Sequence, residues 1–183
     1  SRSLVEYYWT LTPTVILRIL EWHPGIQVLT YVDADLFFFS SPQPLFDELA
    51  DASILIHEHR FSPRQHQLAT HNGRFNVGLL SFRRDTNGRT ALQWWRERCI
   101  EWCFTRYEQG KMGDQLYLND WPERFSGVVV LRHAGGGVGP WNHDQYDIRL
   151  SSRGQILIDQ QPLIFYHFHS FKMNPHLFVY NLP

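Results

Sequence analysis

The feature that most constrains the fold of this 183-residue chain is a pair of aspartates set between two apolar runs. Residues 26–32 are mostly apolar, Asp33 and Asp35 follow with only Ala34 between them, and residues 36–39 are Leu-Phe-Phe-Phe. Side chains at positions i and i+2 of an extended segment lie on the same side. The two carboxylates can therefore converge on one point, and the small Ala34 leaves room for a ligand there.

Two interpretations of this pair stay open at this level. Carboxylates in an apolar setting are costly to bury unless a cation compensates them, and hard divalent cations prefer carboxylate oxygens. The alternative is a strand that ends in solvent, with aspartate in its usual role as a turn former. An isolated Asp-x-Asp pattern does not distinguish these, so the rest of the chain must decide between a metal site and a turn.

Composition limits the class of protein. The chain is 43% hydrophobic and 15% aromatic, which is enough for a core, and its length suits a single domain over residues 1–183. The formal net charge is −1 at pH 7, so neither a nucleic-acid-binding patch nor an acidic tail is expected. No apolar run approaches the roughly 20 residues of a transmembrane segment, and no secretory signal opens the sequence.

The two cysteines bear on the compartment. Cys99 and Cys103 are four residues apart in a segment that we expect to be helical. A disulfide at that spacing on one helix face has poor side-chain geometry. We therefore expect both thiols to be reduced and the protein to be cytoplasmic.

Hydrophobic periodicity alternates between helical and strand patterns along the chain. We expect helices over residues 3–22, 45–50, 90–107 and 114–120. Within the first, Thr12-Pro13 resembles a helix start. We expect strands over residues 27–32, 52–57, 75–82, 128–131, 156–158 and 163–166, with a hairpin as one arrangement of the last two, and a loop over residues 60–74. The alternation predicts an α/β fold with a mixed sheet flanked by helices.

Polar side chains stand at the ends of several expected strands, including the aspartate pair early in the chain and His167 and His169 late in it. Ligands of α/β proteins bind beyond the strand ends. Two carboxylates and one late histidine would form a three-ligand divalent site with open positions, which suits Mn²⁺ or Mg²⁺ better than zinc. The alternative is that the two histidines are simply packed or solvated.

Five short motifs occur in order along residues 31–172. They are Tyr31-Val32-Asp33-Ala34-Asp35-Leu36, Phe75-Asn76-Val77-Gly78-Leu79-Leu80, Gly113-Asp114-Gln115-Leu116-Tyr117-Leu118, Pro140-Trp141-Asn142 and His167-Phe168. In this order they resemble the motifs of GT-A-fold glycosyltransferases, particularly family 8 and similar nucleotide-diphospho-sugar transferases. The order and spacing are more specific than any one motif, and the resemblance covers most of the chain.

The resemblance has departures. Val77 stands where the family usually has serine, and Ser170 stands where glycine is expected. Lys172 is not followed by the Pro-Trp of the family, so the motif does not fix whether His167 or His169 is the third metal ligand. The His-Phe pair at residues 167–168 favours His167. The family also has several strands and helices before its Asp-x-Asp. The resemblance therefore implies an N-terminally truncated GT-A-like domain, with an exposed sheet edge that a partner or a homo-oligomer would cover.

By the same resemblance, the chain would be a metal-dependent glycosyltransferase. It would transfer a sugar from a nucleotide-diphospho-sugar donor, of which a UDP-sugar is the first candidate. The acceptor would be a carbohydrate, a lipid or a protein, and the transfer would retain the configuration of the sugar. Mn²⁺ or Mg²⁺ would bridge the pyrophosphate. The implied site residues are the metal ligands Asp33, Asp35 and His167, the catalytic pair Asp114 and Gln115, and the donor or acceptor contacts Asn76, Gly78, Trp141 and Lys172.

Other interpretations of these residues remain. Asp114 is equally typical of a helix N-terminus, and Trp141 of core packing. The whole domain could bind a sugar or a metal without turnover, or it could be a metal-dependent phosphohydrolase, because acids and histidines at strand ends also serve that chemistry. The ordered motifs favour the transferase.

Overall fold

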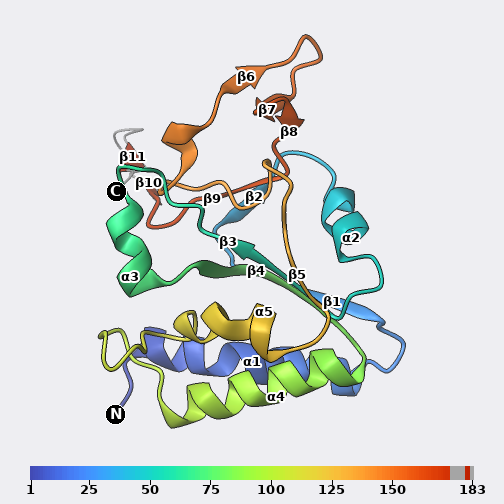
Figure 1. Ribbon diagram of the computed structural model, residues 1–183, viewed down its shortest axis with the longest axis vertical. Helices are drawn as coiled ribbons and strands as arrows, with labels where there is room; N and C mark the ends of the chain where they lie inside the picture. The colour runs from blue at the N-terminus through green and yellow to red at the C-terminus, as the bar shows by residue number, and fades with distance from the viewer. Residues whose placement is uncertain (174–179, 182–183) are drawn as a thin grey trace.

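The computed structural model describes the backbone of residues 1–173 and 180–181 and the side chains of residues 1–171 (Figure 1). A four-stranded sheet lies at its centre, in the order β1 (Val28–Val32), β4 (Phe75–Arg83), β3 (Ile54–Glu58) and β5 (Val128–Val130). The β3–β5 pair is parallel and the other two pairs are antiparallel. The predicted α/β class with a mixed sheet is therefore confirmed.

Both faces of the sheet are covered, and the strand sequences show why. Along β3, Ile54 and Ile56 belong to one buried cluster and Leu55 belongs to another. Consecutive side chains of a strand point to opposite faces, so an unbroken apolar run requires apolar neighbours on both sides. Helices α1 (Leu4–Trp22), α4 (Thr86–Glu101) and α5 (Trp121–Arg124) lie on one side of the sheet (Figure 1). Helix α2 (Gln43–Leu49) lies on the other side with the small β-ribbons.

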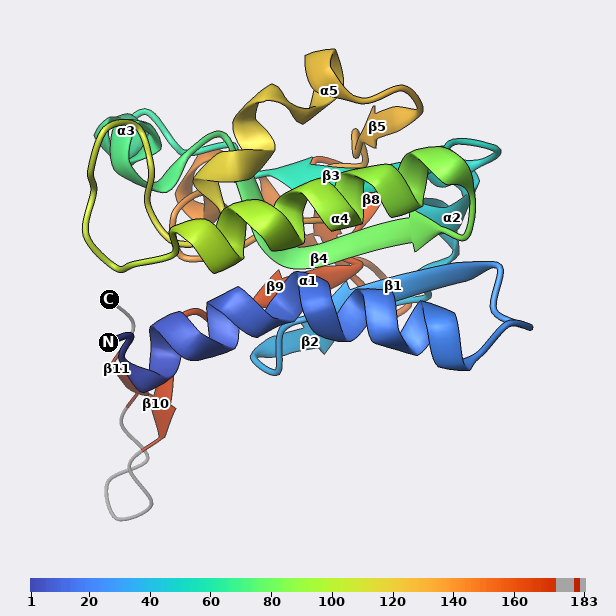
Figure 2. The same cartoon turned by 90° about the horizontal axis from the view of Figure 1, so that it is seen from below.

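Two long helices form most of the first layer. α1 (Leu4–Trp22) and α4 (Thr86–Glu101) lie side by side against the sheet (Figure 2). α1 begins with a capping box, in which the Ser3 side chain and the Glu6 side chain each accept the other's backbone N–H. α4 begins at Asp85, whose carboxylate accepts the backbone N–H of Gly88 at 2.8 Å.

The predicted first helix, over residues 3–22, matches α1, but the helix start inside it and the bounds of α4 are corrected. Thr12-Pro13 is not a helix start, because Pro13 lies inside α1 and the Thr12 hydroxyl donates to the Tyr8 carbonyl at 3.2 Å. The apolar stripe of α1 continues beyond the proline and stays buried, which keeps the helix in place despite the lost backbone bond. α4 spans residues 86–101 rather than 90–107, because Asp85 caps it early and Trp102 is already extended.

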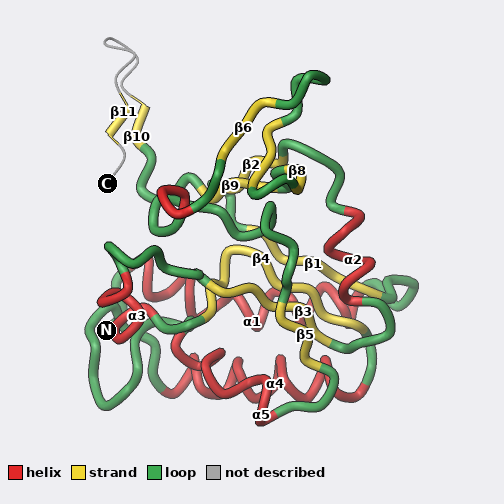
Figure 3. The backbone as a smooth tube through the Cα atoms, turned by 45° about the horizontal axis from the view of Figure 1, so that its top comes forward, coloured by secondary structure: helices red, strands yellow, loops and turns green. Residues whose placement is uncertain are grey.

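The late strands also differ from the hairpin that the sequence suggested. β7 (Ile156–Ile158) pairs antiparallel with β6 (Ile148–Leu150) and β8 (Gln161–Pro162). β9 (Phe165–His167) instead pairs antiparallel with the distant β2 (Leu36–Phe38). These ribbons lie above the central sheet (Figure 3). Residues 36–39 follow the aspartate pair directly, so the partner of β9 comes from the far end of the sequence.

The remaining described elements are short. They are α2 (Gln43–Leu49), η1 (His66–Leu68), α3 (Ala69–Asn72), η2 (Leu116–Asp120), α5 (Trp121–Arg124), η3 (His143–Gln145), β10 (Lys172–Met173) and β11 (Tyr180–Asn181). The expected loop over residues 60–74 thus contains two helical turns. Cys99 and Cys103 are free and buried. None of the described helices is long and apolar enough to span a membrane.

We predict that Leu92→Ala destabilises the fold far more than Ile100→Ala on the same helix. Leu92 is fully buried in the cluster under the sheet, and Ile100 is 46% exposed. The first change should lower the free energy of unfolding by about 2–5 kcal/mol, and the second by no more than about 0.5 kcal/mol. Urea unfolding followed by circular dichroism measures both. Equal losses would show that the inner face of α4 is assigned wrongly.

Candidate active site

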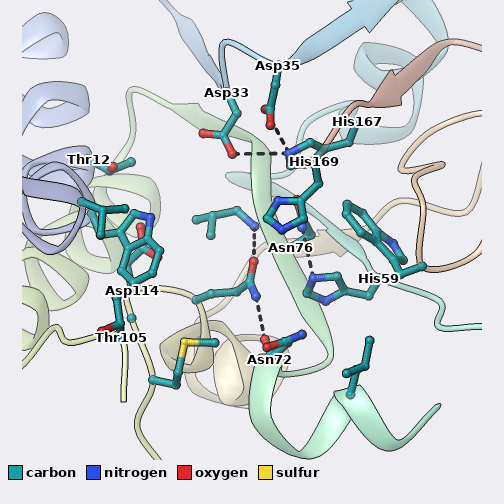
Figure 4. A pocket seen from close by; sticks show the side chains of 18 of the residues that line it. Thr12, Asp33, Asp35, His59, Asn72, Asn76, Thr105, Asp114, His167 and His169 are labelled. Atoms are coloured by element: carbon teal, nitrogen blue, oxygen red, sulfur yellow. Dashed lines mark hydrogen bonds and ion pairs between the residues drawn. The ribbon is translucent and has the colours of Figure 1, made fainter. Parts of the chain in front are cut away.

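A cavity of about 940 Å³ opens at the end of β1, beside the start of β4 and the end of β9. Its lining includes eight of the residues singled out by sequence: Asp33, Asp35, Asn76, Asp114, Gln115, Trp141, His167 and His169. Figure 4 shows the side chains of most of this lining. Residues nearly 140 positions apart in the chain therefore share one site.

Backbone pairing on two sides holds the aspartate pair in place. The Asp33 N–H donates to the Gly78 carbonyl of β4 at 2.8 Å, and the Phe168 N–H donates to the Asp35 carbonyl at 2.8 Å. The β2–β9 register places Leu36 opposite His167. Because Asp35 directly precedes Leu36, this register brings the carboxylates to the late histidine.

Gly78, which the family resemblance implied as a donor or acceptor contact, lies behind the cavity wall. It is not among the described residues that line the cavity. A Cβ at Gly78 would lie 2.7 Å from the His167 ring and 2.6 Å from the Asn76 side-chain oxygen, closer than real contacts allow. The missing side chain therefore makes room for the His167 ring.

Carboxylates and imidazoles converge at this corner. His167 Nε2 lies 3.0 Å from Asp35 Oδ1 and 3.9 Å from Asp33 Oδ2. Asp35, His167 and His169 each offer one ligand atom within 4.8 Å of the others. The sequence left the choice between the two histidines open, and the structure brings both of them to the aspartates. Lys172 lies outside the residues whose side chains are described.

Tyr31 orients one of these carboxylates. Its hydroxyl donates to Asp33 Oδ1 at 2.5 Å, which leaves Asp33 Oδ2 on the side of His167. Burial, with Asp33 close by, raises the pKa of Tyr31 well above its usual range, so the hydroxyl remains a donor. Burial also lowers the pKa of His167 despite the opposing charge of Asp35. The neutral imidazole is the form that binds a metal ion.

His59 and Asn76 form a fixed support beneath the corner. The Asn76 Nδ2 amide donates to His59 Nε2 at 3.1 Å, and the Gly78 N–H donates to Asn76 Oδ1 at 2.7 Å. His59 Nε2 must then be the accepting nitrogen, so Nδ1 carries the proton and donates to the Gly73 carbonyl at 3.1 Å. Burial lowers the pKa of His59 to about 3. The ring is therefore a neutral part of the wall.

Asp114 and Gln115 lie together but are not equivalent. Asp114 is 4% exposed, and burial, reinforced by Cys103, raises the pKa of its carboxyl well above its usual range. The backbone carbonyl of Asp114 accepts from the Trp95 indole at 2.8 Å, which ties it to the core. Both polar atoms of the Gln115 side chain bind the backbone: Oε1 accepts from the Val77 N–H, and Nε2 donates to the Asn72 carbonyl.

Trp141 fills the opposite wall. Its ring meets those of His59 and His167 edge-on, each at 5.2 Å between centroids. The following Asn142 is fully buried and donates to the His59 and Gly137 carbonyls. The hydrogen bonds of Asn142 thus fix the Pro-Trp-Asn loop, which places the indole of Trp141 against the cavity.

Sequence reasoning missed several lining residues. They include Tyr8, Trp9 and Thr12 from α1, Tyr31 from β1, and His59 and Phe61 after β3. For Tyr31 a signal existed, because it lies two positions from Asp33 in a strand and so shares its side. The α1 residues gave no such signal, since helical periodicity does not reveal what the first turns of a helix face.

The lining carries acidic charge and no basic charge. Asp33 and Asp35 contribute it, together with the buried Asp114, whose raised pKa favours the neutral acid. No lysine or arginine lines the cavity among the residues with described side chains. An anionic ligand would therefore find no cationic side chain in this part of the chain. Among the described side chains of the lining, no positive charge balances the aspartates.

No protein-family model matches the chain. It is 36% identical over 179 residues to the uncharacterized protein YfnF of Bacillus subtilis (strain 168), covering 94% of this chain and 59% of that protein. It is also 36% identical over 175 residues to the uncharacterized protein YfnD of the same organism, covering 94% of this chain and 56% of that one. The chain therefore spans less than two thirds of the length of these relatives.

The fold is similar to that of a solved glycosyltransferase. The chain is similar to the crystal structure of a glycosyltransferase involved in the glycosylation of the major capsid of PBCV-1, with a TM-score of 0.60. The match covers 91% of this chain and 74% of that one at 12% identity. At this identity the likeness concerns the fold alone, so the activity has to be argued from the site.

We predict that stability falls as the pH is lowered from about 6.5 towards 3. Burial lowers the pKa of both His57 and His59 from 6.5 to about 3. In this window the unfolded chain binds more protons than the folded one, so the free energy of unfolding decreases with falling pH. Urea titrations at several pH values should show a shallower slope for His59→Gln, by up to one proton. An unchanged slope would mean that His59 titrates normally.

Proposed function

We propose that this chain is a GT-A-type domain of a metal-dependent glycosyltransferase, which moves a sugar from a nucleotide-diphospho-sugar to an acceptor. The observation that carries the proposal is the corner of Asp33, Asp35, His167 and His169 in a cavity with no described basic side chain. A diphosphate is doubly negative and requires cationic partners. In such a lining, a divalent cation at the acidic corner is the available partner.

The donor set fits a divalent cation. Asp35 offers a hard oxygen ligand within 4.8 Å of both imidazoles, and Asp33 would add a second from 3.9 Å away from His167 Nε2. His167, whose pKa is lowered by burial, offers a neutral nitrogen. His167 Nε2 faces the aspartates and is the nitrogen that would bind the cation, whereas Nδ1 is buried on the side of Gly78 without a partner among the described residues. With a second imidazole from His169, this set favours Mn²⁺ over Mg²⁺, because Mg²⁺ prefers oxygen ligands throughout. When bound, the cation would act as a Lewis acid on the departing diphosphate.

The other residues would position the donor sugar. The Asp114 carboxyl lies in the cavity wall with a raised pKa, so it can donate a hydrogen bond to a sugar hydroxyl as well as accept one. Gln115 would hold the segment around Asn72 against β4 and so keep this wall in place. Asn76 and Gly78 would support His59 and His167, and Trp141 would close the far side.

Several finer points of the proposal rest on the ordered motifs. They are the relation to family 8, the UDP-sugar as donor and retention of configuration.

Strand β1 lies at one edge of the central sheet, with β4 as its only partner among the described strands. Unpaired edges invite pairing with another strand. We propose that a further strand of the whole protein, or a second copy, covers this edge.

The phosphohydrolase alternative is less well supported. Two-metal hydrolases hold two ions about 4 Å apart. The part of the chain with described side chains contains one cluster of the required kind. A single divalent site beside a large cavity is better suited to holding a diphosphate while a sugar occupies the remaining space.

Asp35→Asn should weaken Mn²⁺ binding at least tenfold, about 1.4 kcal/mol, and remove Mn²⁺-dependent binding of a UDP-sugar. The amide keeps the shape of the side chain but loses its charge. Isothermal titration calorimetry on the protein encoded by the complete gene, with UDP-, GDP- and ADP-sugars, measures both effects.

The matched control is Asp51→Asn, which changes an exposed aspartate outside the cavity. It should bind Mn²⁺ and donor like the wild type. If Asp35→Asn and Asp51→Asn behave alike, or if no sugar nucleotide binds the wild type in the presence of Mn²⁺, the proposed function is wrong.

His169→Ala should weaken Mn²⁺ binding more than Mg²⁺ binding, because it removes a nitrogen ligand that Mn²⁺ uses better. Electron paramagnetic resonance of Mn²⁺, with Mg²⁺ as competitor, measures the ratio of the two affinities. His66→Ala, on an exposed histidine that does not line the cavity, is the control. An unchanged ratio in His169→Ala would exclude His169 from the metal site.

A further inference from the structure

We infer that the wall of the cavity built by residues 59–72 and Trp141 binds the acceptor, and that this acceptor is a neutral carbohydrate stacked on Phe61. The inference rests on the proposed function and specifies the second substrate. We call this surface the neutral wall and define it by Phe61, Gln65, Leu68, Asn72 and Trp141, all of which line the cavity.

Phe61 is a supported aromatic platform. Its ring stacks on that of His59, with centroids 4.5 Å apart and planes inclined by 12°. His59 is itself fixed by the Gly73 carbonyl and the Asn76 amide. Phe61 is partly exposed and lines the cavity, so the ring has a covered face and surface left for a ligand. A flat apolar face held in this way suits the C–H face of a pyranose ring.

The polar groups of the neutral wall suit hydroxyl groups. Trp141 is 7% exposed, and its Nε1–H is buried without a partner among the described residues. Because this N–H is covered by protein, Trp141 offers the cavity the surface of its ring rather than a hydrogen-bond donor. Gln65 and Asn72 add side-chain amides, each able to donate and to accept. Aromatic surface with a few placed polar groups is the usual make-up of a small-molecule site.

Charge separates this wall from the acidic corner of the cavity. None of the five residues of the neutral wall is ionisable, and His59 behind Phe61 stays neutral because burial lowers its pKa to about 3. The acids lie elsewhere: Figure 4 shows Asp114 across the cavity from His59, with Asp33 and Asp35 at the metal corner. The diphosphate belongs at that corner. Of the uncharged lining that remains, which also includes Tyr8, Trp9 and Thr12 on the α1 side, the neutral wall has the supported Phe61 ring. A charged acceptor would find no counter-charge among its five residues.

Saturation-transfer NMR with methyl pyranosides of glucose, galactose and mannose tests the inference directly. At least one of them should receive saturation from the wild-type protein in the presence of Mn²⁺ and UDP, chiefly on one ring face. Phe61→Leu removes the aromatic face but keeps an apolar side chain, and should reduce the signal at least fivefold. Phe61→Tyr should retain it. Phe46→Leu, an identical change on α2 outside the cavity, should bind like the wild type.

Three results would overturn the inference: no pyranoside binds, Phe61→Leu binds as well as the wild type, or methyl β-D-glucuronide binds better than the neutral sugars. Calorimetry of Mn²⁺ and UDP binding on the same samples distinguishes a failure of the acceptor site from a failure of the proposed function. Loss of pyranoside binding with intact nucleotide binding contradicts only the neutral wall. Absence of nucleotide binding contradicts the proposed function, and the pyranoside result still decides whether the wall takes a sugar.

Discussion

The antiparallel pairing of β2 with β9 is the interaction on which the site depends. It joins Leu36 to His167 and lets the Asp35 carbonyl accept the Phe168 N–H. Without this pairing, the aspartates would end an edge strand and the histidines would belong to a distant ribbon. The metal corner is thus a product of strand register, and a shift of one residue would turn His167 to the other face.

The fit of His167 against β4 adds a second constraint. Its ring occupies the space that a side chain at Gly78 would take, and Asn76 spans from Gly78 to His59. One strand therefore supports both the metal corner and the neutral wall. Because the described lining has no basic side chain, the electrostatics of the cavity depend on what the aspartates hold. This makes a bound cation central to any chemistry with a diphosphate.

Much of this arrangement could be predicted from the sequence, for identifiable reasons. The buried strands and the two long helices followed from apolar periodicity, and the convergence of Asp33 and Asp35 followed from the geometry of a strand. The pairing of β2 with β9 could not be foreseen, because residues 36–38 look like a continuation of an apolar run. The role of Gly78 also depends on a residue about 90 positions away, and local patterns do not report such contacts. Asp85 is a typical helix N-cap residue, but the apolar stripe of α4 begins further along, so the predicted helix started too late.

The central claim is that the corner of Asp33, Asp35, His167 and His169 holds a divalent cation. Anomalous diffraction at the manganese edge, from crystals of the protein grown with Mn²⁺ and UDP, tests it most directly. The account predicts an anomalous peak at roughly 2.0–2.4 Å from Asp35 and at least one of the two histidines, with diphosphate oxygens completing the coordination. UDP bound in the cavity without a peak at this corner, or a peak bound only elsewhere, would contradict the account.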